Sequence, residues 1–144
     1  MMEILSFNVH RTFRVRHAEV RALVRLVLAH ERVTTATVTV VFIDDAKMTD
    51  LNGTYLNHWY ATDVLSFPLE EPKRGILEGE VYVNLDQARR QSTQYRATFA
   101  DEKRRLVIHG VLHLAGHSDR TAGERSAMAA REDRYIARFA ARRQ

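Results

Sequence analysis

The sequence contains no cysteine, only two prolines and six glycines, and no long apolar run. Without cysteine, disulfide scaffolds, thiol catalysis and thiolate metal sites are excluded, so any metal must be held by histidine and carboxylate side chains. No apolar run approaches the ~18 residues of a transmembrane helix. The first basic residues follow the apolar ones instead of preceding them, so no secretory signal is predicted. We therefore expect a cytoplasmic protein with no membrane association.

The length of 144 residues, with 45% hydrophobic and 28% charged residues, is typical of a single globular domain, and residues 1–144 are expected to form one. The net charge is +4, and arginines gather near both ends of the chain. Two basic ends suggest a polyanionic partner such as nucleic acid, although an arginine-rich composition alone can have the same appearance.

Hydrophobic periodicity predicts alternating strands and helices. Strands are expected at residues 4–9, 35–43, 64–67 and 80–84, the second being β-branched throughout. Helices are expected at residues 17–32, 45–55, 86–95, 98–115 and 122–141, with a loop at residues 70–79. This pattern predicts an α+β fold in which a single mixed sheet of about four strands is packed by about five helices. No glycine-rich phosphate loop follows any strand, so no nucleotide cofactor is expected.

The most informative segment is LVIHGVLHLAGHSDRT, residues 106–121. His109 and His113 lie four residues apart on the predicted helix, so both imidazoles share one face and can share a metal ion. Gly116 stands where the helix should end, because glycine readily adopts the left-handed conformation that turns the chain. Both His117 and Asp119 could then supply the third ligand. Asp119 is favoured, because the turn brings it back toward the two histidines and leaves His117 at the rim.

Three protein ligands would leave a fourth position open for water, which is typical of a catalytic zinc site. The alternative is that His109 and His113 are merely half-buried histidines of an amphipathic helix. The segment is zincin-like, but the residue after His109 is Gly110. The glutamate that serves as general base in HExxH metallopeptidases is therefore missing, which disfavours a peptidase.

Three ordered blocks give a specific resemblance. The segment HGVLHLAGHSD from His109 to Asp119 resembles the signature of the YbeY family of rRNA maturation endoribonucleases. The segments LNGTY at residues 51–55 with TDVLSFP at residues 62–68, and GEVYV at residues 79–83, are similar to further family blocks. The resemblance implies one Zn²⁺ per chain held by His109, His113 and Asp119. It also implies a zinc-dependent, single-strand-specific endoribonuclease that acts in the cytoplasm on the 3′ end of 16S rRNA and in quality control of the small ribosomal subunit.

The sequence departs from the family pattern at two positions. Asp119 stands where most members have a third histidine, and Leu56 stands where an arginine is usual. A leucine cannot hold a phosphate. Besides the endoribonuclease, a ribosome-assembly factor with a structural zinc and little nuclease activity is thus an alternative.

Four further residues carry expectations. Asp63 could accept a hydrogen bond from a ligand histidine, or simply shape a turn. Trp59 and Tyr60 are expected to be buried against the sheet, with base stacking as the alternative. His10 is expected to be a surface residue.

Overall fold

The computed structural model describes residues 1–71 and 73–142. Its strands form one mixed sheet in the order β1-β2-β4-β3, with β1, β2 and β4 parallel and β3 antiparallel to β4. The strands are β1 (Met2–Asn8), β2 (Thr35–Ile43), β3 (Val64–Pro68) and β4 (Ile76–Asn84). The helices are α1 (His17–His30), α2 (Asp45–Leu56), α3 (Leu85–Gln94), α4 (Phe99–Leu114) and α5 (Ala122–Arg142). The predicted α+β class is confirmed.

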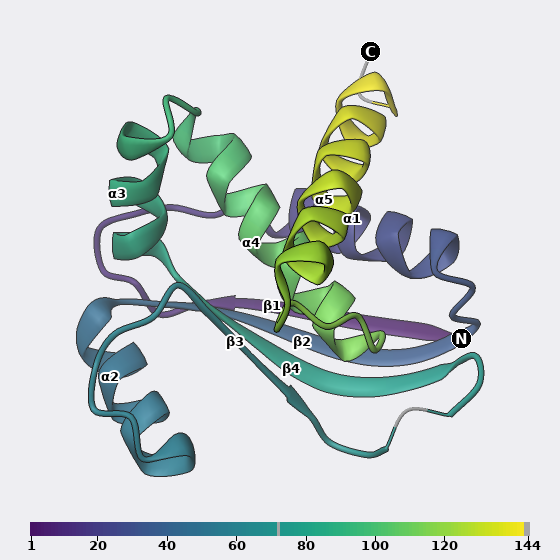
Figure 1. Ribbon diagram of the computed structural model, residues 1–144, viewed down its shortest axis with the longest axis horizontal. Helices are drawn as coiled ribbons and strands as arrows, with labels where there is room; N and C mark the ends of the chain where they lie inside the picture. Colours follow the sequence, from purple (N-terminus) through teal and green to yellow (C-terminus); the bar gives the residue numbers. More distant parts are fainter. Residues whose placement is uncertain (72, 143–144) are drawn as a thin grey trace.

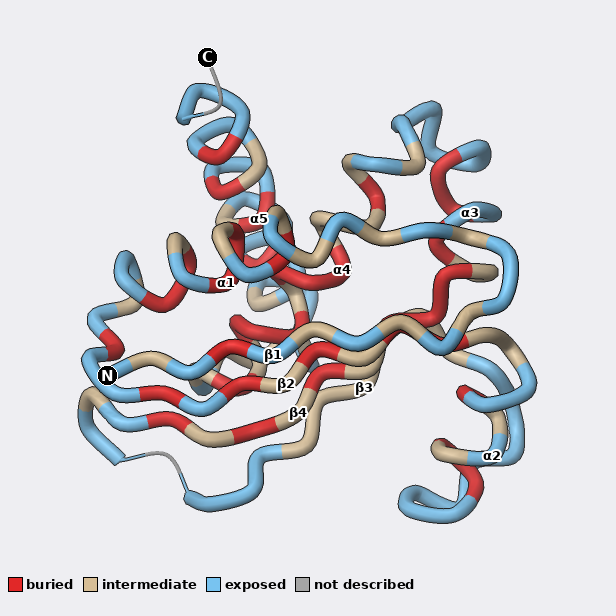
Figure 2. Tube along the Cα trace, turned by 180° about the vertical axis from the view of Figure 1, so that it is seen from behind, coloured by how far each residue is buried: buried red, intermediate tan, exposed pale blue. Residues whose placement is uncertain are grey.

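Helices α1, α4 and α5 lie on one side of the sheet, and α2 lies beyond the opposite side at one end (Figure 1). The core fills the space between the sheet and this helical layer, where the inward side chains are fully buried (Figure 2). Fully burying an aliphatic side chain contributes roughly 1.5–3 kcal/mol, so this interface dominates stability. Its largest members include Leu23, Leu28, Phe42, Ile108 and Leu112.

The sheet face away from this layer remains open to solvent along β1. Phe7 is 51% exposed, whereas Ile4 of the same strand is buried. The apolar alternation of β1 therefore identifies a strand correctly, but its larger side chains face outward.

Strand β4 begins earlier than its composition suggests. The segment at residues 70–79 was expected to be a loop, yet β4 starts at Ile76, which is in register with Thr35 of β2. Residue 72 of that segment lies outside the described residues. Gly79 is required by packing, since a Cβ there would lie 2.6 Å from Cδ2 of Leu114. Glycine thus marks a close approach of α4 to the sheet here, and the loop expectation was wrong for residues 76–79.

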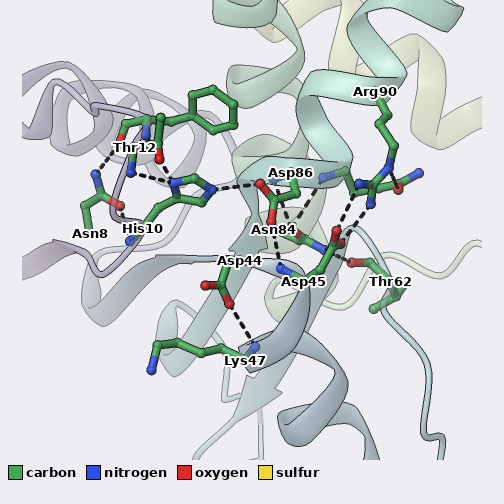
Figure 3. A network of polar contacts seen from close by, with 12 residues as sticks. Asn8, His10, Thr12, Asp44, Asp45, Lys47, Thr62, Asn84, Asp86 and Arg90 are labelled. Atoms are coloured by element: carbon green, nitrogen blue, oxygen red, sulfur yellow. Dashed lines mark hydrogen bonds and ion pairs between the residues drawn. The ribbon is translucent and has the colours of Figure 1, made fainter.

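A polar network joins the carboxyl ends of the parallel strands to α2 and α3 (Figure 3). Nδ1 of His10 accepts hydrogen bonds from the backbone amides of Thr12 and Phe13, so Nε2 carries the hydrogen and donates to Asp86 at 2.8 Å. Asp86 also accepts from the backbone amide of Asp45. The His10 side chain is only 7% exposed, so the expectation of a surface histidine was wrong.

The aromatic residues after α2 are exposed and not buried against the sheet. Trp59 is 64% and Tyr60 57% exposed. The Trp59 ring covers the end of α2 so closely that a Cβ on Gly53 would lie 2.1 Å from it. The expectation of burial against the sheet was therefore wrong, because the indole packs on its own helix instead. No helix in the described part of the chain has the length and apolarity to span a bilayer.

Candidate metal centre

Helix α4 has well-defined ends that place its last turn. Thr98 caps the start by accepting a hydrogen bond from the amide of Asp101. At the other end, Gly116 has a positive φ of 101°. The amide of Gly116 donates to the carbonyl of His113, and the amide of His117 donates to the carbonyl of Leu112. These two bonds form a Schellman motif. The turn expected at Gly116 is confirmed, and it sends the chain back along the helix.

Gly110 brings the middle of α4 against the sheet. A Cβ at this position would lie 2.3 Å from Cγ1 of Val81, and Ser66 of β3 donates a hydrogen bond to the Gly110 carbonyl at 2.9 Å. No larger side chain fits there without moving a strand. The absence of the peptidase glutamate is thus a packing requirement, and position 110 faces the sheet instead of the cavity.

His109, His113 and Asp119 converge at the end of α4. Nε2 of His109 and Nε2 of His113 are 3.0 Å apart, and Oδ2 of Asp119 lies 3.3 Å from the first and 3.2 Å from the second. All three residues are half-buried and can each offer one atom to a shared metal ion.

The spacing of these atoms fits a small metal ion. Ligand atoms around a tetrahedral zinc with bonds of ~2.0–2.1 Å lie roughly 3.4 Å from one another. The three observed separations approach this value on every side of the triangle. Two imidazole nitrogens and one carboxylate oxygen are also suitable chemistry for zinc. The residues present therefore fit a metal ion held by three protein ligands.

Glu132 supports this arrangement from α5, and the sequence analysis missed it. Nδ1 of His109 donates to Oε2 of Glu132 at 2.6 Å, and Arg105 donates to the other carboxylate oxygen at 3.1 Å. The bond fixes the tautomer in which Nε2 of His109 presents its lone pair toward the triad. Burial opposes the charged form of His109, but the carboxylate of Glu132 outweighs it and raises the pKa of His109. The role considered for Asp63 is filled by Glu132.

An open cavity of about 440 Å³ lies over the triad. Asp63 and Ser66 contribute polar groups to its wall, and Asp63 accepts a hydrogen bond from the amide of Val64. No arginine or lysine is found among the described residues that line it. Leu56, 45% exposed at the end of α2, lies outside this lining.

His117 points away from the triad. Its Nε2 donates to Oε1 of Glu31 at 2.5 Å, and the hydroxyl of Tyr135 donates to the other oxygen of the same carboxylate. Burial opposes ionisation of Glu31, but these two hydrogen bonds prevail and lower its pKa. His117 therefore ties the loop after α4 to α1 and α5, which leaves Asp119 as the residue beside the two histidines.

A mixed sheet that supports a helix with two histidines, a returning carboxylate and an open cavity defines a metal-dependent hydrolase. Residues 5–140 match the family described as Endoribonuclease YbeY, and the chain belongs to this family. The resemblance seen in the sequence is confirmed, and the protein is an endoribonuclease involved in rRNA maturation. The family assignment supports the endoribonuclease over the peptidase alternative.

Similar proteins named Endoribonuclease YbeY extend over most of the chain. That of Chlorobium phaeovibrioides is 34% identical over 134 residues, which cover 92% of this chain and 89% of the relative. That of Chlorobium chlorochromatii is 39% identical over 113 residues, 78% of this chain and 71% of the relative. The solution structure of TM1509 from Thermotoga maritima has a TM-score of 0.66 at 23% identity, with 96% of this chain and 89% of that chain covered. This last likeness concerns the fold.

Proposed function

We propose that the protein is a zinc-dependent endoribonuclease whose single Zn²⁺ is held by His109, His113 and Asp119. Its substrate is single-stranded RNA at the 3′ end of 16S rRNA, and it acts in the cytoplasm on the small ribosomal subunit, including its quality control. Residues 1–144 act together as one domain. The observation that carries the proposal is the convergence of three ligand atoms, 3.0–3.3 Å apart, beneath an open cavity.

A zinc ion at the triad supplies Lewis acidity toward a phosphate oxygen and lowers the pKa of water. The protein's own groups do the rest. Glu132 keeps the imidazole of His109 in the required tautomer, and the hydrogen bond from Arg105 holds the Glu132 carboxylate in place. Asp63 lines the cavity beside the triad, and we assign it the role of the base that takes a proton from an attacking water at a carboxylate oxygen.

The size and position of the cavity support a preference for single strands. A hollow of about 440 Å³ between β3 and the end of α4 admits a nucleotide that is splayed out of a flexible strand. A stiff duplex cannot bring its backbone into such a recess without unpairing, whereas loops and ends can.

One observation favours a second function. Because no arginine or lysine lines the cavity within the described residues, and Leu56 replaces the usual arginine, charge stabilisation at the phosphate is weak there. This favours an assembly factor that binds the small subunit through the same surface and cleaves RNA slowly or not at all.

The deciding experiment is RNA cleavage by protein that has been stripped of metal and then reconstituted with zinc. We expect single-stranded RNA to be cleaved only after zinc is restored, and a duplex of the same sequence to resist. His113→Ala, purified in parallel, should be inactive, which excludes a contaminating nuclease. Full zinc occupancy and binding to small subunits without any cleavage would instead establish the assembly factor.

A further inference from the structure

Arginine is absent from the described lining of the triad cavity but is present on one side of α5. Arg131, Arg134 and Arg138 follow one another at intervals of three and four residues, which places them on the same side of a helix. Arg134 and Arg138 are exposed and Arg131 is half-buried. Along the helix axis, Arg134 lies ~4.5 Å beyond Arg131, and Arg138 lies ~6 Å beyond Arg134, at a rise of 1.5 Å per residue. The three side chains, which we call the arginine row, thus form a line of positive charge along α5.

Two hollows connect this row to the loop that carries the third ligand. One, of about 250 Å³, is lined by Arg131, Arg134 and Arg138 together with residues at the end of α1. The other, of about 240 Å³, is lined by Gly116 and again by Arg131. The loop at residues 116–119 takes part in both hollows, since Gly116 lines this one and Asp119 lines the triad cavity. A flexible strand that leaves the triad cavity therefore meets the arginine row after crossing a single loop.

The charges of the arginine row are not neutralised by ion pairs within the described residues. Across residues 1–71 and 73–142, the side chains of Arg131 and Arg134 make no ion pair within 4.0 Å, and Arg138 contacts the ring nitrogens of His30. Arg105, on α4, differs sharply because it is bound by Glu132 and Asp133.

Glu31, the carboxylate beside the row, already accepts hydrogen bonds from other side chains. Glu31 accepts hydrogen bonds from His117 and Tyr135, and these bonds hold the loop, α1 and α5 in a fixed relation. The row thus keeps a constant position relative to the triad, and its three positive charges outnumber the carboxylates of Glu31 and Glu124 that line the two hollows.

We propose that Arg131, Arg134 and Arg138 bind successive phosphates of the single-stranded RNA outside the triad cavity, so that the strand runs across the loop at residues 116–119 and along α5. The inference rests on the proposed nuclease function and gives the substrate its path. Arginine suits this role because its guanidinium group holds phosphate oxygens in pairs and retains its charge. In this proposal, the row raises the affinity for longer RNA, and cleavage takes place at the triad.

The test compares two triple variants of the zinc-loaded protein with equal loss of charge. The first is Arg131→Ala with Arg134→Ala and Arg138→Ala. The matched control is Arg11→Ala with Arg14→Ala and Arg16→Ala, in the exposed segment between β1 and α1. Steady-state cleavage is measured with RNAs of about four and about twenty nucleotides, which lie near and above the site sizes of single-strand binders.

We expect the α5 variant to lose about tenfold or more in kcat/KM for the long RNA at low salt and to cleave the short RNA normally. The slope of log kcat/KM against log salt should become shallower by about 2, since each phosphate contact on a single strand contributes about 0.7. The control should keep the wild-type length dependence. The single variant Arg134→Glu, at an exposed position, should show the same loss and guards against misfolding of the triple variant.

The outcomes separate the two proposals. Unchanged length and salt dependence in the α5 variant would overturn the path along α5. If the control variant loses the length dependence and the salt dependence, the strand would instead run over the segment between β1 and α1. Wild-type protein that cleaves neither RNA at full zinc occupancy would refute the nuclease proposal itself, and the path with it.

Discussion

Glu132 of α5 lies 2.6 Å from Nδ1 of His109 of α4, through its Oε2 atom. The carboxylate is buried, and its other oxygen contacts Arg105. The helix that bears the arginine row thus also orients His109, a candidate metal ligand. The substitutions proposed for the arginine row leave Glu132 in place, so they should weaken RNA binding without disturbing the candidate metal centre.

Replacing Glu132 by glutamine should weaken zinc binding by about 10- to 100-fold, as is usual when a partner of a ligand histidine is changed. An amide can still accept from Nδ1, but it brings no negative charge to raise the basicity of His109. Competition with a chromophoric chelator measures the effect. Asp133→Asn removes the neighbouring exposed partner of Arg105 and should leave zinc affinity unchanged. Equal affinities for the wild type and Glu132→Gln would show that Glu132 has no part in the site.

Replacing Gly110 by alanine should lower the free energy of unfolding by about 1–3 kcal/mol, because the added methyl group overpacks the contact between α4 and the sheet. Its Cβ would lie 2.3 Å from Val81 and 3.2 Å from Ser66. Gly123→Ala is the matched control, since a Cβ there meets no atom within 4 Å. Chemical denaturation compares the two variants, and comparable stability would mean that α4 does not approach the sheet so closely.

Replacing Leu56 by arginine should leave stability within about 0.5 kcal/mol of the wild type, because the side chain is exposed and no charge becomes buried. We expect faster RNA cleavage at unchanged zinc content, since the variant adds a cation where the family resemblance leads us to expect one. A single transition-state donor is worth up to roughly 10²–10³-fold in rate. Identical cleavage rates in the two proteins would show that this end of α2 does not reach the substrate.

The Glu31 cluster should make stability depend on pH on the acidic side. The pKa of Glu31 is lowered in the folded protein from its ordinary value of 4.5, because the hydrogen bonds of His117 and Tyr135 outweigh the cost of burial. A lowered folded pKa means that this stabilisation is complete above about pH 4.5 and is lost as the pH falls through the folded value.

Glu31→Gln should be less stable at neutral pH, and its disadvantage should shrink as the pH falls below 4.5. Thermal unfolding of both proteins as a function of pH measures this. A difference that stays constant down to strongly acidic pH would contradict the lowered pKa of Glu31.

The sequence predicted those features that depend on neighbours along the chain. The β-branched residues of β2, the histidine spacing on α4 and the turn at Gly116 are local, so they could be read directly. Glu132 and Glu31 could not be found in this way, because each meets its histidine only through helix packing across a long stretch of sequence. An acid on the inward side of the last helix was the available signal for Glu132.

The errors have the same origin. The start of β4 contains glycine and charged residues that are typical of a loop, yet pairing with β2 extends it as a strand. Trp59 has the large apolar side chain of a core residue, but its ring covers Gly53 at the end of α2. Tertiary contacts decided both outcomes, and they are not visible in a local window of sequence.

Zinc stoichiometry and affinity in Asp119→Ala, set beside His117→Ala, test the central assignment most directly. Oδ2 of Asp119 lies within 3.3 Å of both histidine nitrogens, whereas Nε2 of His117 is bound to Glu31. We expect the wild type to bind one zinc per chain, Asp119→Ala to lose most of its affinity, and His117→Ala to retain it with reduced stability. Full affinity in Asp119→Ala together with loss in His117→Ala would contradict the metal centre described above.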